Sequence, residues 1–247
     1  MCRMLGVVSR GPVPYDLFEE FADLAATGAC PSGPPDERGH RDGWGLVAFL
    51  NGALLVDARG AGGAPDDPRF FQAAWKVARI NPERREGSLL AVLAHVRRAS
   101  PGGNAGVENT HPRLREALGR RWAFAHNGTL KGFDYGREGS LDSDAYFASV
   151  LGGVDRGVFE AYRGASAEMH RRYRPTSLTS LLTDGRGIHA LRLCNGSPEY
   201  YTLHQDHWGE AVVLCSEPLP LMKASPVGNG RMLSVGPDLR VETASLV

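Results

Sequence analysis

The chain has 247 residues, of which 42% are hydrophobic and 23% charged, with 28 Lys and Arg balancing 28 Asp and Glu. This composition is typical of a globular protein, and the zero net charge argues against nucleic acid or an anionic membrane as a partner. No apolar run approaches the roughly 20 residues that cross a bilayer, and Ser9 and Arg10 interrupt any signal-peptide core. Four scattered cysteines without a C-x-x-C pair favour the reducing cytoplasm over a disulfide-bonded secreted protein.

The hydrophobic periodicity predicts helices and strands in blocks. Helices are expected at 16–26, 70–80, 143–151 and 158–173. Strands are expected at 4–9, 46–50, 53–58, 88–96, 122–125, 178–182, 188–193, 200–204 and 211–215, and Asn51-Gly52 is a strong hairpin signal between two of them. Helices clustered in mid-chain, with strand hairpins on both sides, indicate an α+β protein of stacked sheets sandwiched by helices.

Cys2 is the first residue that suggests chemistry. Removal of Met1 would leave a thiol and a free α-amine on one residue, and an α-amine with its ordinary pKa of about 7.7 is partly a neutral base at physiological pH. N-terminal nucleophile hydrolases use a Thr, Ser or Cys that is activated in this way by its own amine. A small buried cysteine at the start of the first strand is the alternative, and it is favoured for Cys2 taken alone.

Three downstream segments carry polar residues suited to a site. The stretch from His40 to Gly45 indicates a tight backbone around the large ring of Trp44, or a glycine-rich turn that enters a strand. His95-Val96-Arg97-Arg98-Ala99-Ser100 ends an apolar strand, where an arginine can hold a carboxylate with its fork or form a structural ion pair. Asn109-Thr110-His111-Pro112 is by itself typical of a turn.

A fourth segment, His126-Asn127-Gly128, also follows a strand and is by itself typical of a hairpin turn. Its functional interpretation is an oxyanion hole made by the Asn127 side-chain amide and the Gly128 N–H. Asp142-Ser143-Asp144 then opens a helix. These residues can form an N-cap at the positive end of the helix dipole, or they can supply a carboxylate for a substrate ammonium.

Taken in order, these motifs resemble one family, the class II glutamine amidotransferases, and within it a small stand-alone glutaminase subgroup. The similar motifs are Met-Cys-Arg-x-Leu-Gly, His-x-Asp-Gly-Trp-Gly, His-x-Arg-x-x-Ser, Asn-Thr-His-Pro, His-Asn-Gly and Ser-x-Asp-Ser-Asp. They run from Cys2 to about Asp144, and a weaker similarity extends to 216–219. The resemblance implies the N-terminal nucleophile (Ntn) hydrolase fold, a four-layer αββα sandwich of two mainly antiparallel sheets, with residues 1–247 as a single domain.

The resemblance also implies a catalytic group. Cys2 would attack the side-chain amide carbon of glutamine, with its own α-amine as general base through a water. Asn127 and Gly128 would stabilise the oxyanion that forms. A further set of residues would support or shape the pocket: His40, Asp42, Trp44, His95, Asn109 and His111.

The resemblance implies substrate-binding residues as well. Arg97, helped by Ser100, would hold the substrate α-carboxylate, and Asp142 would bind the α-ammonium. An amino-acid substrate needs one cation, one anion and one oxyanion site, and the sequence offers each. This chemistry needs no cofactor, and the polar stretch from His204 to His207 is interpreted as surface rather than as a metal site.

The leading hypothesis is an amidohydrolase that acts on glutamine or another γ-glutamyl amide and releases glutamate with ammonia or an amine. Better-known relatives carry a synthase domain or act with one, so a separate ammonia-accepting synthase subunit is a partner that the resemblance allows. A narrower alternative is removal of γ-glutamate from a sulfur-containing intermediate, as in ergothioneine synthesis. A non-catalytic protein that binds an amino acid or a partner is the third hypothesis. Neither nucleic acid nor a membrane is expected as a partner.

Overall fold

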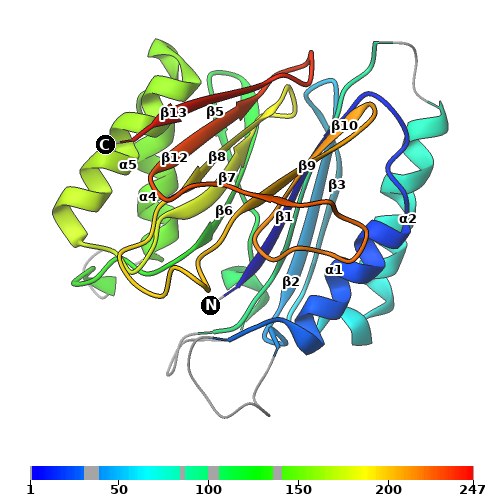
Figure 1. The fold of residues 1–247 in the computed structure, drawn as a ribbon, viewed down its shortest axis with the longest axis horizontal. Coiled ribbons are helices and arrows are strands. Elements are labelled where there is room, and N and C mark those ends of the chain that lie inside the picture. The colour runs from blue at the N-terminus through cyan, green and yellow to red at the C-terminus, as the bar shows by residue number, and fades with distance from the viewer. Residues whose placement is uncertain (1, 31–38, 84–86, 100–105, 136–140, 247) are drawn as a thin grey trace.

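The computed structural model describes residues 2–30, 39–83, 87–99, 106–135 and 141–246. Two antiparallel sheets face each other, and helices cover the outer side of each (Figure 1). The expected α+β, four-layer αββα sandwich is confirmed. Among the residues described, no helix is both long and apolar enough to span a membrane.

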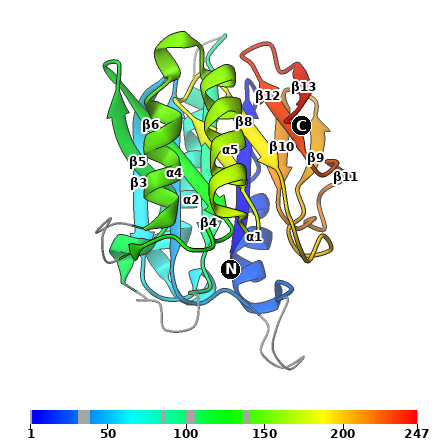
Figure 2. The ribbon, with the colours of Figure 1, turned by 90° about the vertical axis from the view of Figure 1, so that its left-hand side faces the viewer.

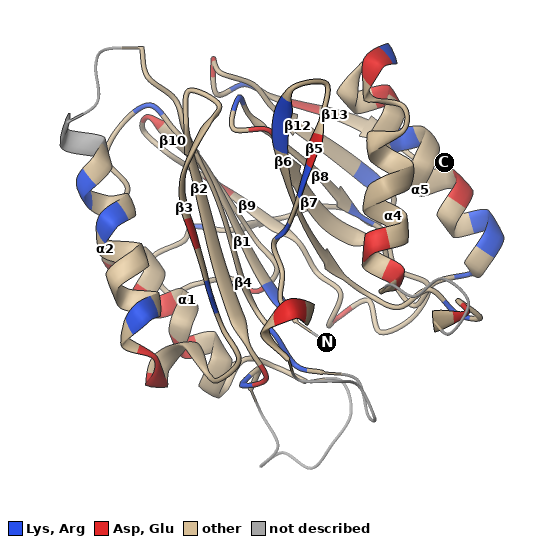
Figure 3. Ribbon diagram, turned by 180° about the vertical axis from the view of Figure 1, so that it is seen from behind, with Lys and Arg blue, Asp and Glu red and all other residues tan. Residues whose placement is uncertain are grey.

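The first sheet has the strand order β11-β9-β10-β1-β4-β2-β3, so β1 lies at its centre. Its strands are β1 (Arg3–Ser9), β2 (Trp44–Leu50), β3 (Ala53–Gly60), β4 (Leu90–Val96), β9 (His204–Trp208), β10 (Ala211–Cys215) and β11 (Ser225–Pro226). The strands β2, β4 and β10 carry no charged residue and are uniformly tan in Figure 3. Such continuous apolar strands are typical of a sheet that is covered on both faces.

The second sheet has the order β13-β12-β8-β7-β6-β5. Its strands are β5 (Arg113–Ala117), β6 (Arg120–Asn127), β7 (Thr179–Thr183), β8 (Ile188–Arg192), β12 (Arg231–Val235) and β13 (Val241–Ser245). The helices α1 (Asp16–Thr27) and α2 (Pro68–Glu83) cover the first sheet, and α4 (Asp142–Leu151) and α5 (Val158–Tyr173) lie side by side over the second (Figure 2). Short 3₁₀ helices within the described ranges are η1 (Ala64–Asp66), η2 (Val107–Asn109) and η3 (Val154–Arg156).

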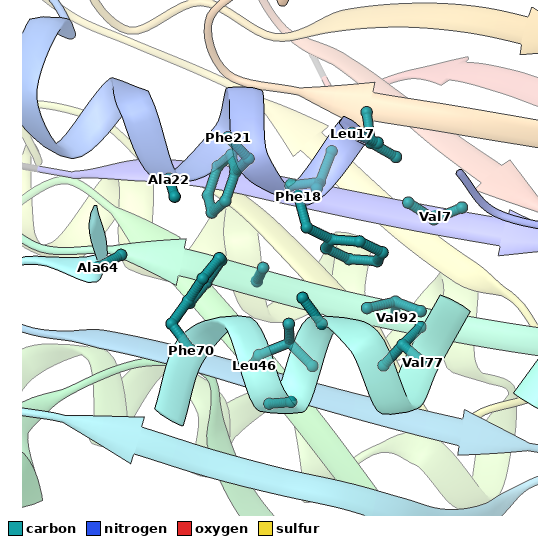
Figure 4. Close-up of a cluster of buried hydrophobic side chains, with 14 of the residues drawn as sticks. Val7, Leu17, Phe18, Phe21, Ala22, Leu46, Ala64, Phe70, Val77 and Val92 are labelled. Carbon is teal, nitrogen blue, oxygen red and sulfur yellow. The ribbon is translucent and has the colours of Figure 1, made fainter. Parts of the chain in front are cut away.

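The alternation of side chains along β1 divides the core into layers. Leu5 and Val7 pack with α1 and α2 in an outer core that also holds Phe18 and Phe70 (Figure 4). Met4 and Val8 point the other way, into the core between the two sheets. Burying one such side chain contributes roughly 1.5–3 kcal/mol. Because successive residues alternate, Cys2 has the parity of Met4 and belongs to the side that faces the second sheet.

Most of the predicted elements are confirmed. The Asn51-Gly52 hairpin forms with φ of 53° and 83° at its two residues, and α5 has the predicted bounds. The strand predicted at 200–204 is wrong, because Tyr200 and Tyr201 lie in a turn with their rings 5.0 Å apart. Strands β5, β11, β12 and β13 were not predicted, and neither was β9 beyond its first residue, His204.

The stretch from His204 to His207 is strand β9 rather than a simple surface turn. Asp206 is buried, and its carboxylate accepts hydrogen bonds from the Trp208 indole at 2.6 Å and from the Lys223 N–H at 2.7 Å. Within the described ranges, no group of three or more His, Cys, Asp or Glu is arranged to hold a metal ion.

Candidate active site

Cys2 and Asn127 join the two sheets at one end of the sandwich. The Cys2 N–H donates to Asn127 Oδ1 at 3.1 Å, and Asn127 Nδ2 donates back to the Cys2 carbonyl oxygen at 2.9 Å. Both residues are buried. An amide nitrogen carries two hydrogens, so one Nδ2–H of Asn127 remains for another acceptor.

Gly128 follows directly and needs to be glycine. A Cβ at this position would collide with the carbonyl oxygen of Ser177 and would lie 2.9 Å from His126 Nε2. The Asn127-Gly128 pair does not form a hairpin, because β7, the strand that pairs with β6 here, begins only at Thr179. Glycine therefore permits the chain to pass close to Ser177 as it leaves β6.

Arg97 lies immediately after β4, opposite the nucleophile candidate. Arg3 pairs with Val96, so the register places Arg97 across from Cys2. The Arg97 N–H donates to the Gly43 carbonyl at 2.8 Å, Asp42 N donates to the Arg97 carbonyl at 2.9 Å, and the Asp42 carboxylate accepts from Ala99 N at 2.8 Å. The glycine-rich motif around Asp42 thus holds the backbone of the Arg97 segment in place.

Asp142 is the first residue of α4 and Leu141 occupies the N-cap position, so none of the three residues 142–144 is the N-cap; Asp142 and Asp144 do lie in the first turn, at the positive end of the helix dipole. The Asp142 carboxylate accepts from Leu130 N at 2.9 Å and from Ser143 N at 2.8 Å. Tyr135 lies nearby: burial, with the Asp142 charge, raises the pKa of its hydroxyl to about 12. Two backbone donors therefore orient a nearly buried carboxylate.

His126 supports this carboxylate from the helix side of β6. Its Nε2 lies 3.1 Å from the Ser177 carbonyl oxygen, which can only accept, so Nε2 carries the proton. Its Nδ1 then accepts from the Ser143 hydroxyl at 2.9 Å. Burial lowers the pKa of His126, so the ring is neutral at physiological pH. The ring fixes Ser143, the neighbour of Asp142.

His95 and His111 form a second buried histidine group, with ring centroids 4.8 Å apart. In the described part of the chain neither ring nitrogen of either residue has a hydrogen-bond partner. Burial lowers the pKa of His95 to about 3 and that of His111 well below its ordinary value. The backbone of His111 crosses β2 so closely that a Cβ on Gly45 would collide with its carbonyl oxygen.

The other expected residues are spread more widely. Trp44 lies in the outer core, donates to Asp67 Oδ2 at 3.0 Å and packs edge-on against Phe70, so it shapes the α2 side of the first sheet. His40 is buried against Gly28 at the end of α1. Asn109 is at the end of η2, with its amide 3.4 Å from Glu108. Ser100 lies outside the described residues.

Two residues near Cys2 were not expected from the sequence. The Cys2 thiol points to the carbonyl oxygen of Arg98 at 3.9 Å, and the Tyr200 hydroxyl donates to the Cys2 carbonyl at 3.5 Å. Tyr200 is nearly two hundred residues away along the chain and belongs to the segment that was predicted as a strand. No local pattern marks it.

The chain is similar in sequence to curated relatives. The chain is 32% identical over 158 residues to the protein named "putative glutamine amidotransferase YafJ" of Escherichia coli strain K12, covering 61% of this chain and 54% of the relative. It is 32% identical over 181 residues to a "putative glutamine amidotransferase" of Haemophilus influenzae, covering 72% of this chain and 52% of the relative. The matches thus span only about half the length of these relatives.

Solved structures share the fold. Glutamine phosphoribosylpyrophosphate amidotransferase from B. subtilis superposes with a TM-score of 0.66 at 18% identity, covering 100% of this chain and 49% of that one. A glutamine aminotransferase class-II domain protein from Silicibacter pomeroyi superposes with a TM-score of 0.63 at 17% identity, covering 98% of both chains. The family model for class II glutamine amidotransferases matches residues 1–198. With this match over most of its length, the chain belongs to the class II glutamine amidotransferases.

Proposed function

We propose that this protein hydrolyses the side-chain amide of glutamine, or of a related γ-glutamyl amide, with Cys2 as nucleophile after removal of Met1. The observation that carries the proposal is the double hydrogen bond between Cys2 and Asn127, at 3.1 and 2.9 Å. These bonds bring the thiol-bearing residue, its nitrogen and a side-chain amide donor together.

The proposed reaction begins at the Cys2 thiol. Its proton passes to the free α-amine, through a water, and sulfur forms a bond to the amide carbon. The carbonyl electron pair moves to oxygen, and the second Nδ2–H of Asn127 and the N–H of Gly128 stabilise that oxyanion. Collapse expels ammonia or an amine, which takes up the proton. Water then attacks the thioester, releasing glutamate and restoring the thiol.

Substrate recognition is assigned to two charged residues, Arg97 and Asp142. Arg97 would pair with the α-carboxylate, and Asp142 would accept from the α-ammonium. The Leu130 N–H occupies one lone pair of Asp142 Oδ2 at 2.9 Å, and a carboxylate oxygen accepts about two hydrogen bonds, so Oδ2 can accept another. These residues bind the glutamyl half of the substrate and leave the departing amine to other contacts.

The wider assignments are parts of the same proposal. We take residues 1–247 as one glutaminase domain, located in the cytoplasm, where the four free cysteines would stay reduced. Glutamine or a γ-glutamyl amide is the small-molecule partner, and a separate synthase is the proposed acceptor of ammonia.

Three measurements test the proposal together. Intact mass should show that active protein starts at Cys2. An electrophilic glutamine analogue should add once, at Cys2, and Cys2→Ala should reduce glutamine hydrolysis to background while the protein stays folded. The matched control is Cys194→Ala, since Cys194 is also a buried free cysteine. Full activity of a uniform Met1-bearing protein, or labelling at Cys194 with loss of activity, would reject the mechanism.

A further inference from the structure

Arg3 follows Cys2 directly, and the roles assigned above leave it unused. Its side chain is only 2% exposed. It has the parity of Leu5 and Val7 along β1, so it points away from the side that Cys2 faces. Removing a guanidinium from water is costly unless its groups are paired, so a buried arginine here needs a structural reason.

Each nitrogen of the Arg3 guanidinium lies close to an oxygen. Nη1 donates to the Tyr200 carbonyl at 3.2 Å and Nη2 donates to the Ala29 carbonyl at 2.8 Å, while Nε lies 2.5 Å from the Glu217 carboxylate in an ion pair without hydrogen-bond geometry. The guanidinium carbon also lies 4.2 Å from the centroid of the Tyr200 ring, in a cation–π contact. The planar fork of arginine suits this set of acceptors, which a lysine could not match.

These contacts gather three loops around the residue that follows Cys2. Ala29 comes after α1, Tyr200 lies between β8 and β9, and Glu217 comes after β10. Glu217 closes the group by accepting from Ala29 N at 3.1 Å. The Tyr200 hydroxyl then returns to the Cys2 carbonyl at 3.5 Å, the same oxygen that accepts from Asn127 at 2.9 Å.

We propose that Arg3 is a positioning residue for Cys2, acting through Glu217 and Tyr200. Together with Asn127, this group fixes the direction of the Cys2 carbonyl and so the rotation about its Cα–C bond. That rotation sets where the thiol and the α-amine point. The inference rests on the proposed function of Cys2. It adds to that function the residues that orient the Cys2 thiol, namely Arg3, Glu217 and Tyr200.

The expected signature is a change in kcat rather than in KM. The Arg3 group contacts neither Arg97 nor Asp142 through any of the bonds described above, so binding of the glutamyl half should persist. A misplacement of the reacting atoms by about 1 Å can cost roughly 100-fold in rate. Arg3→Lys keeps the charge and loses the fork, and we expect it to lower kcat for glutamine by about 10–100-fold, with KM within about 3-fold.

The chain offers a matched control in Arg192. Its guanidinium donates to the carbonyls of Tyr201, Val227 and Pro198 at 3.1, 2.6 and 2.9 Å, so it anchors the same loop without bonding to Arg3 or Cys2. Arg192→Lys should therefore leave kcat within about 3-fold. Tyr200→Phe removes one oxygen and keeps the ring over Arg3, and kcat should fall by about 3–10-fold, the size of one hydrogen bond.

The decisive experiment measures kcat and KM for glutamine in these three variants, with the rate at which the electrophilic analogue labels Cys2. An unchanged kcat in Arg3→Lys, a rise in KM alone, or an equal loss in Arg192→Lys would overturn the inference. If Arg3→Lys does not fold, Tyr200→Phe decides, and an unchanged kcat there overturns it. Activity that survives Cys2→Ala would reject the proposed function itself, which is a distinguishable outcome.

Discussion

Cys2 is held from two sides, and the two sides use different means. On the side of the second sheet, which we call the catalytic side after the role proposed for it, Asn127 contacts Cys2 with its own side-chain amide at 3.1 and 2.9 Å. On the other side, the supporting side, Arg3 forms an ion pair with Glu217 and donates to two backbone carbonyls, and its group reaches Cys2 through the Tyr200 hydroxyl at 3.5 Å. The catalytic side has side-chain groups that could contact a substrate, whereas the supporting side holds the backbone of Cys2 in place.

This difference has a kinetic consequence. A side chain that contacts the reacting atoms stabilises the transition state directly, whereas a residue that acts through a backbone changes only how well those atoms are placed. Substitutions on the catalytic side should therefore separate cleanly into effects on kcat and effects on KM. Substitutions on the supporting side should give graded losses in kcat.

The largest effect is expected at Asn127. Asn127→Ala removes a proposed oxyanion donor, and loss of one such donor typically lowers kcat by about 10²–10³-fold, with little change in KM. Steady-state kinetics with glutamine measure this. Asn195→Ala is the control, because its amide donates to the Pro175 carbonyl at 2.7 Å, away from Cys2. A rise in KM with kcat preserved would show that Asn127 binds the ground state instead.

The catalytic side could be predicted in part from the sequence, because its proposed chemistry resides in side-chain types at motif positions. Asn127, Gly128 and Asp142 were expected near Cys2, and of these Asn127 hydrogen-bonds to it. The supporting side was not predictable. The bonds of Arg3 to Ala29 and Tyr200 end on backbone carbonyls, which every residue has, at separations of 26 and 197 residues along the chain.

The fold shows the same limit. Apolar strands such as β4 and β10 and the amphipathic α5 were predicted because buried positions in a helix or strand produce a recognisable pattern of hydrophobic residues along the sequence. Strand β5 was missed because Arg113–Ala117 lies at the edge of its sheet and carries charges on a half-exposed surface. Tyr200 and Tyr201 have high β propensity, but their turn packs the two rings against each other and Cys194 in a separate cluster.

The next effect separates binding from chemistry within the catalytic side. Asp142→Asn removes the charge proposed to hold the substrate ammonium, so KM for glutamine should rise by about 10–100-fold, with a smaller change in kcat. The matched control is Asp144→Asn, because Asp144 is a neighbouring, nearly buried carboxylate that pairs with Arg113 at 2.9 and 2.8 Å. Equal changes in the two variants, or a fall in kcat alone at Asp142, would contradict the assignment.

Acid should weaken the fold through the buried histidines. His95, His111 and His126 are buried, and burial lowers the pKa of each, to about 3 for His95. The unfolded chain, with a histidine pKa near 6.5, binds more protons below that pH, so their contribution to stability is fully present above about pH 6.5 and declines as the pH falls, for His95 down to about pH 3. Each buried histidine can lower the free energy of unfolding by up to about 1.4 kcal/mol for every pH unit below about pH 6.5.

Urea unfolding at pH 7.5, 6.5 and 5.5 measures this decline in the free energy of unfolding. His95→Gln should give a shallower slope, whatever its stability at pH 7.5, because one neutral imidazole is no longer buried. His207→Gln is the control, since His207 is exposed on β9 and should leave the slope as it is. Parallel slopes in the His95 variant and the parent protein would show that the buried histidines do not set the acid sensitivity.

The smallest effect is expected at Tyr135, whose side chain is 48% exposed, and whose hydroxyl has its pKa raised by partial burial and by the charge of the nearby Asp142. Tyr135→Phe removes this hydroxyl, while the backbone donors Leu130 and Ser143 still orient the carboxylate. A hydrogen bond at a partly exposed site contributes about 0.5–1.5 kcal/mol, so KM should change by no more than about 10-fold, with kcat unchanged. Because the pKa of Tyr135 is about 12, the effect should be the same from pH 7 to pH 9. A fall in kcat would instead indicate that Tyr135 contributes to the chemical step, and it would contradict the assignment of this region to substrate binding.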